Sequence, residues 1–177
     1  MPGTRLFARR VERRAAVAVG VPVIVLSRID SRLIHGQVIE AWLPHLAVKR
    51  VVVADDEAAV DPLAKAAYLM AIPPGVELVL LPVNKIDFRH FATDGVPTLV
   101  LFREVKSAVA ARQSGLPDGM LNVGNVHAGP GRISVSRSVY LDLSDSQALA
   151  ALAQSGMTVR VQSVPSETAQ PLASIGS

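Results

Sequence analysis

The chain has no cysteine and few aromatic residues: its 177 residues include four Phe, two Tyr and one Trp. The absence of cysteine excludes disulfide bonds and thiolate chemistry, and it agrees with a cytoplasmic protein. Proteins that bind single-stranded nucleic acid use aromatic side chains interleaved with basic ones, and this sequence holds no such set.

The body of the chain carries almost no net charge, although the sequence pI is about 9.7. Residues 1–20 contain five arginines and one glutamate, a net charge of +4, so the rest of the chain carries −1 of the overall +3. A nearly neutral body does not provide the basic surface that nucleic acid requires. We therefore expect no nucleic-acid partner.

No apolar run is long enough to span a membrane, which takes about 20 residues. The basic start followed by 15–26 has the outline of a secretory signal, but cleavage there would remove the segment that best fits a first core strand. We expect a flexible basic tail over 1–20, one α/β domain over 21–166, and a C-terminal tail over 167–177.

Several site motifs are also missing. The first strand-to-helix turn lacks G-x-G-x-x-G, and the chain contains neither a P-loop nor a G-x-S-x-G nucleophile elbow. Oxygen and nitrogen ligands exist in principle at His35, Asp55, Asp56 and His127, but no metal-binding spacing joins them. We therefore expect no metal and no cofactor.

Strands and helices alternate along the chain. The β-branched runs 21–27 and 49–54 are each followed by apolar residues at helical spacing. We predict one helix from about Gly36, bent or ended by Pro44, with Val38, Ile39, Trp42 and Leu46 buried. A second helix over 61–71 has Asp61 as its N-cap.

The alternation continues to the C-terminal end. Strands are predicted over 76–81, 98–102, 120–123 and 158–164, helices over 84–91, 104–114 and 144–155, and a strand or hairpin over 132–143. Parallel strands need long crossovers, which place helices over the sheet. The predicted fold is a single-domain α/β fold with a mostly parallel open sheet, helices on both faces, and an antiparallel strand near the C-terminal part.

The segment 28–37, Arg-Ile-Asp-Ser-Arg-Leu-Ile-His-Gly-Gln, follows the first strand directly and carries the most chemistry. In its neutral form the imidazole of His35 has a free nitrogen lone pair that can attack phosphorus. Arg32 offers a planar cation for phosphate oxygens, and Gly36 opens a helix whose first amides favour an anion. Asp30 can orient the imidazole. From spacing alone, an ordinary helix-start histidine beside a surface arginine fits equally well.

Other polar residues follow the ends of neighbouring strands, where ligands bind in open α/β sheets. Asp55 begins an acidic run that serves equally well as a helix cap. His127 comes after a glycine-containing turn. We predict that the pocket around His35 is lined by Gln37, Asp55, Asn122, Gly124 and His127.

The segment 28–38 closely resembles the phosphorylation-site motif of the IIB components of the mannose/fructose/sorbose class of the bacterial sugar phosphotransferase system. The segments 51–57, 73–76 and 121–127 also resemble that family, in the same order. Together the likeness covers about residues 22–165.

This resemblance implies a phosphotransferase in which His35 accepts a phosphoryl group on Nδ1 from a IIA phosphohistidine and passes it to a sugar. Arg32 would stabilise the transferring group, while Asp30 and the loop amides would shape the pocket. The membrane components IIC and IID would hold the sugar, which places the protein at the inner face of the membrane. The 177 residues hold no IIA domain, so the donor is expected to be a separate protein.

The sequence departs from the family pattern at Ser31, where an acidic residue is frequent, and in the basic tail 1–20. Two further interpretations stay open. One is a regulatory protein that is phosphorylated on His35 without sugar transfer, and the other is an α/β module that only binds a small anion. A homo-oligomer also stays open, and the sequence does not identify a sugar.

Overall fold

The structure, a computed structural model, describes residues 23–172. The predicted tail 1–20 and the last five residues lie outside that range. Within it, no helix has both the length and the apolar character needed to cross a membrane.

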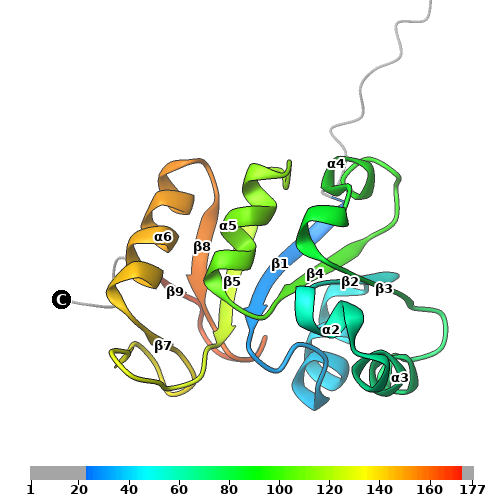
Figure 1. Cartoon of the computed structure of the whole chain (residues 1–177), viewed down its shortest axis with the longest axis horizontal. Helices are drawn as coiled ribbons and strands as arrows, with labels where there is room; N and C mark the ends of the chain where they lie inside the picture. Colours follow the sequence, from blue (N-terminus) through cyan, green and yellow to red (C-terminus); the bar gives the residue numbers. More distant parts are fainter. Residues whose placement is uncertain (1–22, 173–177) are drawn as a thin grey trace, which may run out of the picture.

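A seven-stranded sheet in the order β3-β2-β4-β1-β5-β8-β9 forms the centre of the molecule (Figure 1). Its first six strands are parallel, and β9 runs antiparallel to β8. The strands are β1 Ile24–Asp30, β2 Arg50–Ala54, β3 Glu77–Leu81, β4 Thr98–Phe102, β5 Met120–Asn125, β8 Thr158–Val161 and β9 Gln170–Pro171. The β-branched run of β2 is fully buried, as expected where helices cover both faces. The predicted α/β class is confirmed.

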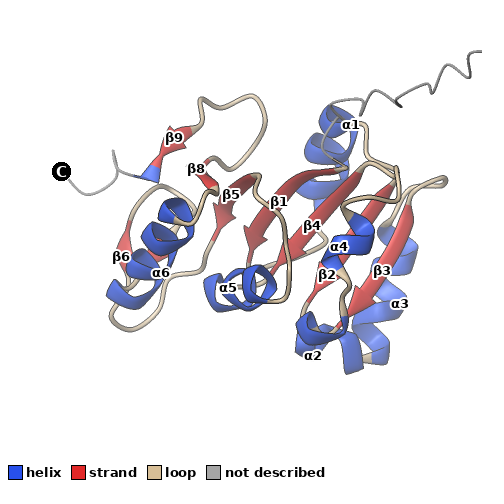
Figure 2. Cartoon of the chain, turned by 90° about the horizontal axis from the view of Figure 1, so that it is seen from above, coloured by secondary structure: helices blue, strands red, loops and turns tan. Residues whose placement is uncertain are grey.

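Helices cover both faces of the sheet (Figure 2). They are the π-helical segment η1 Val38–Trp42, α1 Leu43–Leu46, α2 Asp56–Val60, α3 Pro62–Ala71, the 3₁₀ turn η2 Val83–Lys85, α4 Phe88–Phe91, α5 Val105–Gln113 and α6 Leu143–Gln154. One core cluster joins the sheet to α5 and α6, through residues such as Ala108 and Leu149. The other joins it to η1 and α1, through Trp42 and Leu43, and α3 adds partly buried residues.

The helix after β1 begins at Gly36 as predicted, but over Val38–Trp42 it widens into a π-helical turn. Such turns are frequent at functional sites. Asp61 caps α3 and Pro62 follows it, which confirms the predicted start of that helix. Sequence reasoning missed α2, whose five residues are too few to show helical periodicity.

The C-terminal third differs more from the predictions. The predicted hairpin is present as β6 Ile133–Ser134 and β7 Tyr140–Leu141, which pair antiparallel. The predicted strand 158–164 ends at Val161, and the chain turns back to form β9. The folded region therefore reaches into the segment expected to be a tail.

The predicted helix 84–91 is divided into η2 and α4, and the cap of α4 is Asp87.

Candidate functional site

The loop after β1 brings His35 back over the end of its own strand. Asp30 is the last residue of β1, and its carbonyl accepts a hydrogen bond from the amide of Leu33 at 2.9 Å. Leu33 adopts a left-handed conformation with φ of 54°, which reverses the chain, and its side chain is fully buried. The amide of Ser31 donates to the carbonyl of Asn125 at 2.9 Å and ties the loop to β5. Backbone hydrogen bonds and the buried side chain of Leu33 together hold the loop in place.

The Asp30 carboxylate is the centre of this loop and is fully buried. Its Oδ2 lies 3.0 Å from Nε2 of His35 and 2.8 Å from Nη2 of Arg28, and its Oδ1 accepts from the amide of Arg32 at 3.1 Å. An ionised carboxylate only accepts hydrogen bonds, so Nε2 of His35 carries the proton. The lone pair of a neutral imidazole is then on Nδ1, to which no described residue donates a hydrogen bond.

Two opposing effects determine the pKa of Asp30. Burial by itself raises the pKa of this carboxyl group. The hydrogen bond to His35 and the charge of Arg28 lower the pKa by more than burial raises it, so the pKa of Asp30 lies below its ordinary value. The group is therefore ionised at neutral pH. It acts on His35 as a fixed negative charge.

Arg28 lies beneath Asp30 and is itself fully buried. Its Nη1 donates to the side-chain oxygen of Asn122 and to the carbonyl of Gln162, and its Nη2 also donates to the carbonyl of Ser163 at 3.1 Å. Burial lowers the pKa of Arg28, while the charge of Asp30 opposes that shift. The buried ion pair is thus anchored to β5 and to the end of β8.

The indole ring of Trp42 covers the same guanidinium. The centre of the Arg28 guanidinium lies 4.9 Å from the ring centroid, and the indole Nε1 donates to the carbonyl of Ser163 at 3.0 Å. Trp42 belongs to η1, so this contact joins the helix that follows His35 to the buried ion pair.

The solvent side of the loop carries Arg32 and Gln37. The Arg32 side chain is 41% exposed, its Nη2 donates to Oε1 of Gln37 at 2.7 Å, and its Nε lies 3.8 Å from Asp30. Gly36 has open space where a side chain would be. The first amides of a helix have no carbonyl acceptor within it. The arrangement can therefore present an imidazole nitrogen, a guanidinium and free amides to one anion.

The structure brings five of the predicted site residues into one connected set: Asp30, Arg32, His35, Gln37 and Asn122. Gly124 belongs to the same neighbourhood through its close approach to Arg28. The backbone amide of His127 donates to Oγ of Ser31 at 3.3 Å, so this exposed residue lies beside the loop.

Asp55 is engaged elsewhere. Its carboxylate caps α2 at the amide of Ala58 and forms a two-point ion pair with Arg103, with both distances 2.8 Å. Its strand β2 is separated from β1 by β4. Within residues 23–172, no cluster of three or more His, Cys, Asp or Glu side chains is arranged to hold a metal ion.

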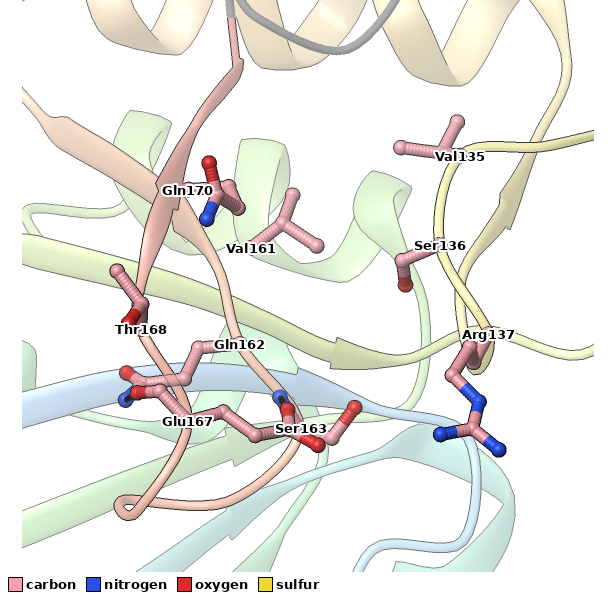
Figure 3. Close-up of a pocket in the computed structure, with 9 residues that line it drawn as sticks. All are labelled: Val135, Ser136, Arg137, Val161, Gln162, Ser163, Glu167, Thr168 and Gln170. Carbon is pink, nitrogen blue, oxygen red and sulfur yellow. Dashed lines mark hydrogen bonds between the residues drawn. The ribbon is translucent and has the colours of Figure 1, made fainter.

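An open hollow of about 330 Å³ lies beside Gln162 and Ser163 (Figure 3). Its walls come from the β6–β7 turn, the end of β8 and the segment before β9, and Gln162 and Ser163 belong to both the hollow and the Arg28 network. Figure 3 shows the Arg137 side chain directed away from the centre of the hollow. None of the predicted site residues lines it.

Sequence reasoning missed the roles of Arg28, Trp42 and Ser163. An arginine within an otherwise apolar strand, two residues before an aspartate, was the available signal for a buried ion pair. Trp42 was expected only as a core residue. No sequence pattern could indicate that backbone carbonyls 134 and 135 positions away would accept hydrogen bonds from Arg28.

Comparison with protein families gives a match over residues 24–175 to the sorbose subfamily IIB component of the PTS system. The chain is 35% identical over 153 residues to the N-acetylgalactosamine-specific phosphotransferase enzyme IIB component 2 of Escherichia coli, covering 86% of this chain and 98% of that protein. It is 29% identical to the fructose-specific EIIB component of Bacillus subtilis, covering 86% and 94%.

The fold of this chain is also similar to solved structures. ManxB from Thermoanaerobacter tengcongensis is similar with a TM-score of 0.77 and 32% identity, covering 85% of this chain and 93% of that one. The IIBSor domain of the sorbose permease from Klebsiella pneumoniae has a TM-score of 0.78 and 25% identity, with the same coverage.

Proposed function

The chain belongs to the sorbose subfamily of IIB components of the sugar phosphotransferase system, and on this basis we propose that it is a cytoplasmic phosphocarrier working through His35. It takes a phosphoryl group from a IIA phosphohistidine and passes it to a sugar during uptake. The observation that carries the proposal is the 3.0 Å contact between Asp30 Oδ2 and Nε2 of His35, which leaves Nδ1 as the basic nitrogen.

In the first step, the Nδ1 lone pair of His35 attacks phosphorus while the bond from phosphorus to the donor imidazole breaks. The donor nitrogen keeps the bonding electron pair. The His35 ring then holds the phosphoryl group on Nδ1 and a proton on Nε2, so the ring is cationic. The buried negative charge of Asp30 stabilises that cation at 3.0 Å.

Arg32 and the first amides of the helix support the phosphoryl group itself. The reaction needs in-line geometry and stabilisation of charge on the equatorial oxygens, more than acid–base chemistry. The exposed guanidinium of Arg32 provides that charge, and Gln37 holds it at 2.7 Å. Gly36 leaves the amides open to the approaching group.

In the second step, a sugar hydroxyl attacks phosphorus, its proton passes to solvent, and Nδ1 regains its lone pair. IIC and IID membrane components deliver the sugar, and the protein meets the inner face of the membrane through them. The relatives are named for different sugars, including N-acetylgalactosamine, fructose and sorbose, so we propose no single sugar. Asp55 and His127 stay predicted pocket residues.

The test is phosphorylation of the intact chain by a phosphorylated IIA donor, followed by detection of acid-labile phosphate. We expect label on the wild type and on His127→Ala, and none on His35→Ala. An unlabelled wild type with a cognate donor, or label on His35→Ala, would overturn the proposal. Adding membranes that contain IIC and IID together with sugar should remove the label, and a label that persists would favour the regulatory alternative.

A further inference from the structure

Trp42 is a buried core residue whose polar atom is bound to the network of the buried ion pair. It is the last residue of η1 and is 3% exposed. A buried indole N–H needs an acceptor, and here Nε1 donates to the carbonyl of Ser163 at 3.0 Å. The centre of the Arg28 guanidinium lies 4.9 Å from the ring centroid. The indole therefore contacts the cation and one of its acceptors at the same time.

The carbonyl of Ser163 is shared between Trp42 and Arg28. It accepts from the indole Nε1 at 3.0 Å and from Nη2 of Arg28 at 3.1 Å. The other polar groups of Ser163 are also engaged: its amide donates to Oε2 of Glu167 at 3.1 Å, and its hydroxyl lies 2.5 Å from that of Ser138. Figure 3 shows Ser163 and Glu167 side by side. The shared oxygen is thus held in place for both donors.

The same nitrogen of Arg28 extends the network to the imidazole. Nη2 donates to Oδ2 of Asp30 at 2.8 Å, and this oxygen lies 3.0 Å from Nε2 of His35. Among the described residues, Nε of Arg28 is buried without a hydrogen-bond partner. The guanidinium is therefore held through its two terminal nitrogens and by the face of the indole ring, so its position depends on Trp42.

Trp42 is also connected to His35 through the helix. His35 directly precedes the helix, and its carbonyl accepts a hydrogen bond from the amide of Ile39 at 3.0 Å. Trp42 lies one turn after Ile39 and ends the π-helical segment. A shift of the indole would therefore move two things, the helix start that carries His35 and the ion pair beneath it.

From these contacts we infer that Trp42 is a positioning residue for His35. Its indole fixes Arg28 relative to the helix start, which keeps Oδ2 of Asp30 opposite Nε2 of the imidazole. The expected effect on phosphoryl transfer rests on the proposed function. The geometry itself belongs to the unphosphorylated protein and is tested without any transfer.

The first test observes the His35 ring by ¹⁵N–¹H NMR of the intact chain. A ring proton held on Nε2 by a buried carboxylate should exchange slowly with water and give a visible signal, which His35→Ala identifies by its loss. We expect the signal in the wild type and its broadening in Trp42→Leu. Trp42→Phe keeps an aromatic face and loses only the N–H, so it should broaden the signal less. A wild type without the signal, or Trp42→Leu with an unchanged signal, would refute the inference.

The second test measures the rate at which a phosphorylated IIA donor labels His35. Trp42→Leu should be labelled about 10- to 100-fold more slowly than the wild type, since small misplacements of reacting groups have effects of this size. Leu43→Ala is the matched control, because Leu43 is the next residue, is 4% exposed and has a purely apolar side chain. It should lower the melting temperature and leave the NMR signal and the labelling rate unchanged. Equal losses of signal and rate in Trp42→Leu and Leu43→Ala would show that Trp42 acts only by packing.

The two tests separate this inference from the proposed function. A wild type that takes no label from a cognate donor would overturn the phosphocarrier function, and the NMR signal would still decide whether Trp42 positions His35. A labelled wild type whose signal and rate are unaffected by Trp42→Leu would overturn the positioning role alone.

Discussion

The guanidinium of Arg28 packs so closely against the backbone of Gly124 that no side chain fits at position 124. A methyl group added at Gly124 would lie 1.9 Å from the central carbon of the Arg28 guanidinium and about as close to both terminal nitrogens. Gly124 therefore makes room for a buried cation, and its importance to the site is indirect. Through Arg28 and Asp30, this glycine on β5 supports the imidazole of His35.

We predict that Gly124→Ala disturbs both folding and phosphorylation. The guanidinium is held by Asp30, Asn122 and two backbone carbonyls, so overpacking should cost about 1–3 kcal/mol of unfolding free energy. Denaturant unfolding measures this cost. Gly119→Ala is the matched control, because an added methyl group there meets nothing within 4 Å. Equal stability of the two variants would contradict the close packing of Arg28 against Gly124.

Replacing Arg28 alone should lower the unfolding free energy more than replacing Arg28 and Asp30 together. In Arg28→Met the carboxylate of Asp30 stays buried without its main ion-pair partner, which should cost about 3–5 kcal/mol of unfolding free energy. In Arg28→Met/Asp30→Leu no charge is stranded, so the loss should be smaller than the sum of the two single losses. Lys106→Met, at an exposed ion pair with Glu104, should change stability little. Strict additivity of the two buried changes would exclude coupling.

Stability should depend on the ionisation of Asp30. Its pKa is lowered in the folded state, so the carboxylate stabilises the fold at pH values above the unfolded pKa of about 3.9. That contribution is lost as the pH falls through the lower, folded pKa. The difference in unfolding free energy between wild type and Asp30→Asn should therefore shrink on going from about pH 6 to about pH 3. A difference that grows on acidification would contradict a lowered pKa of Asp30 in the folded state.

Arg32 should affect the rate of phosphoryl transfer with little effect on folding. Its guanidinium is half-exposed, so Arg32→Gln should retain the wild-type melting temperature. The rate of His35 labelling by a phosphorylated IIA donor should fall about 10²–10³-fold, as on loss of one charge-stabilising group. Gln37→Ala keeps the cation and loses only its 2.7 Å acceptor, so it should slow labelling less. Wild-type rates in Arg32→Gln would remove Arg32 from the mechanism.

Most of the secondary structure could be predicted because its signals are local. The β-branched run at 51–53 and the Asp61-Pro62 start of α3 depend on neighbours within one turn or one strand. The boundaries that failed depend on distant partners. The segment after Val161 turns back to form β9, a pairing that no local pattern predicts.

The sequence by itself determined the α/β class, the strand-to-helix turn that carries His35, and the arginine and glycine beside it. These follow from apolar periodicity and from residues within about ten positions of one another. Only the tertiary structure decided which imidazole nitrogen is held and what lies beneath it. The proton on Nε2 depends on Asp30, and Asp30 depends on a buried arginine whose other acceptors lie more than 90 residues away. Hydrogen bonds over such separations exist only once the sheet has brought β1, β5 and β8 together.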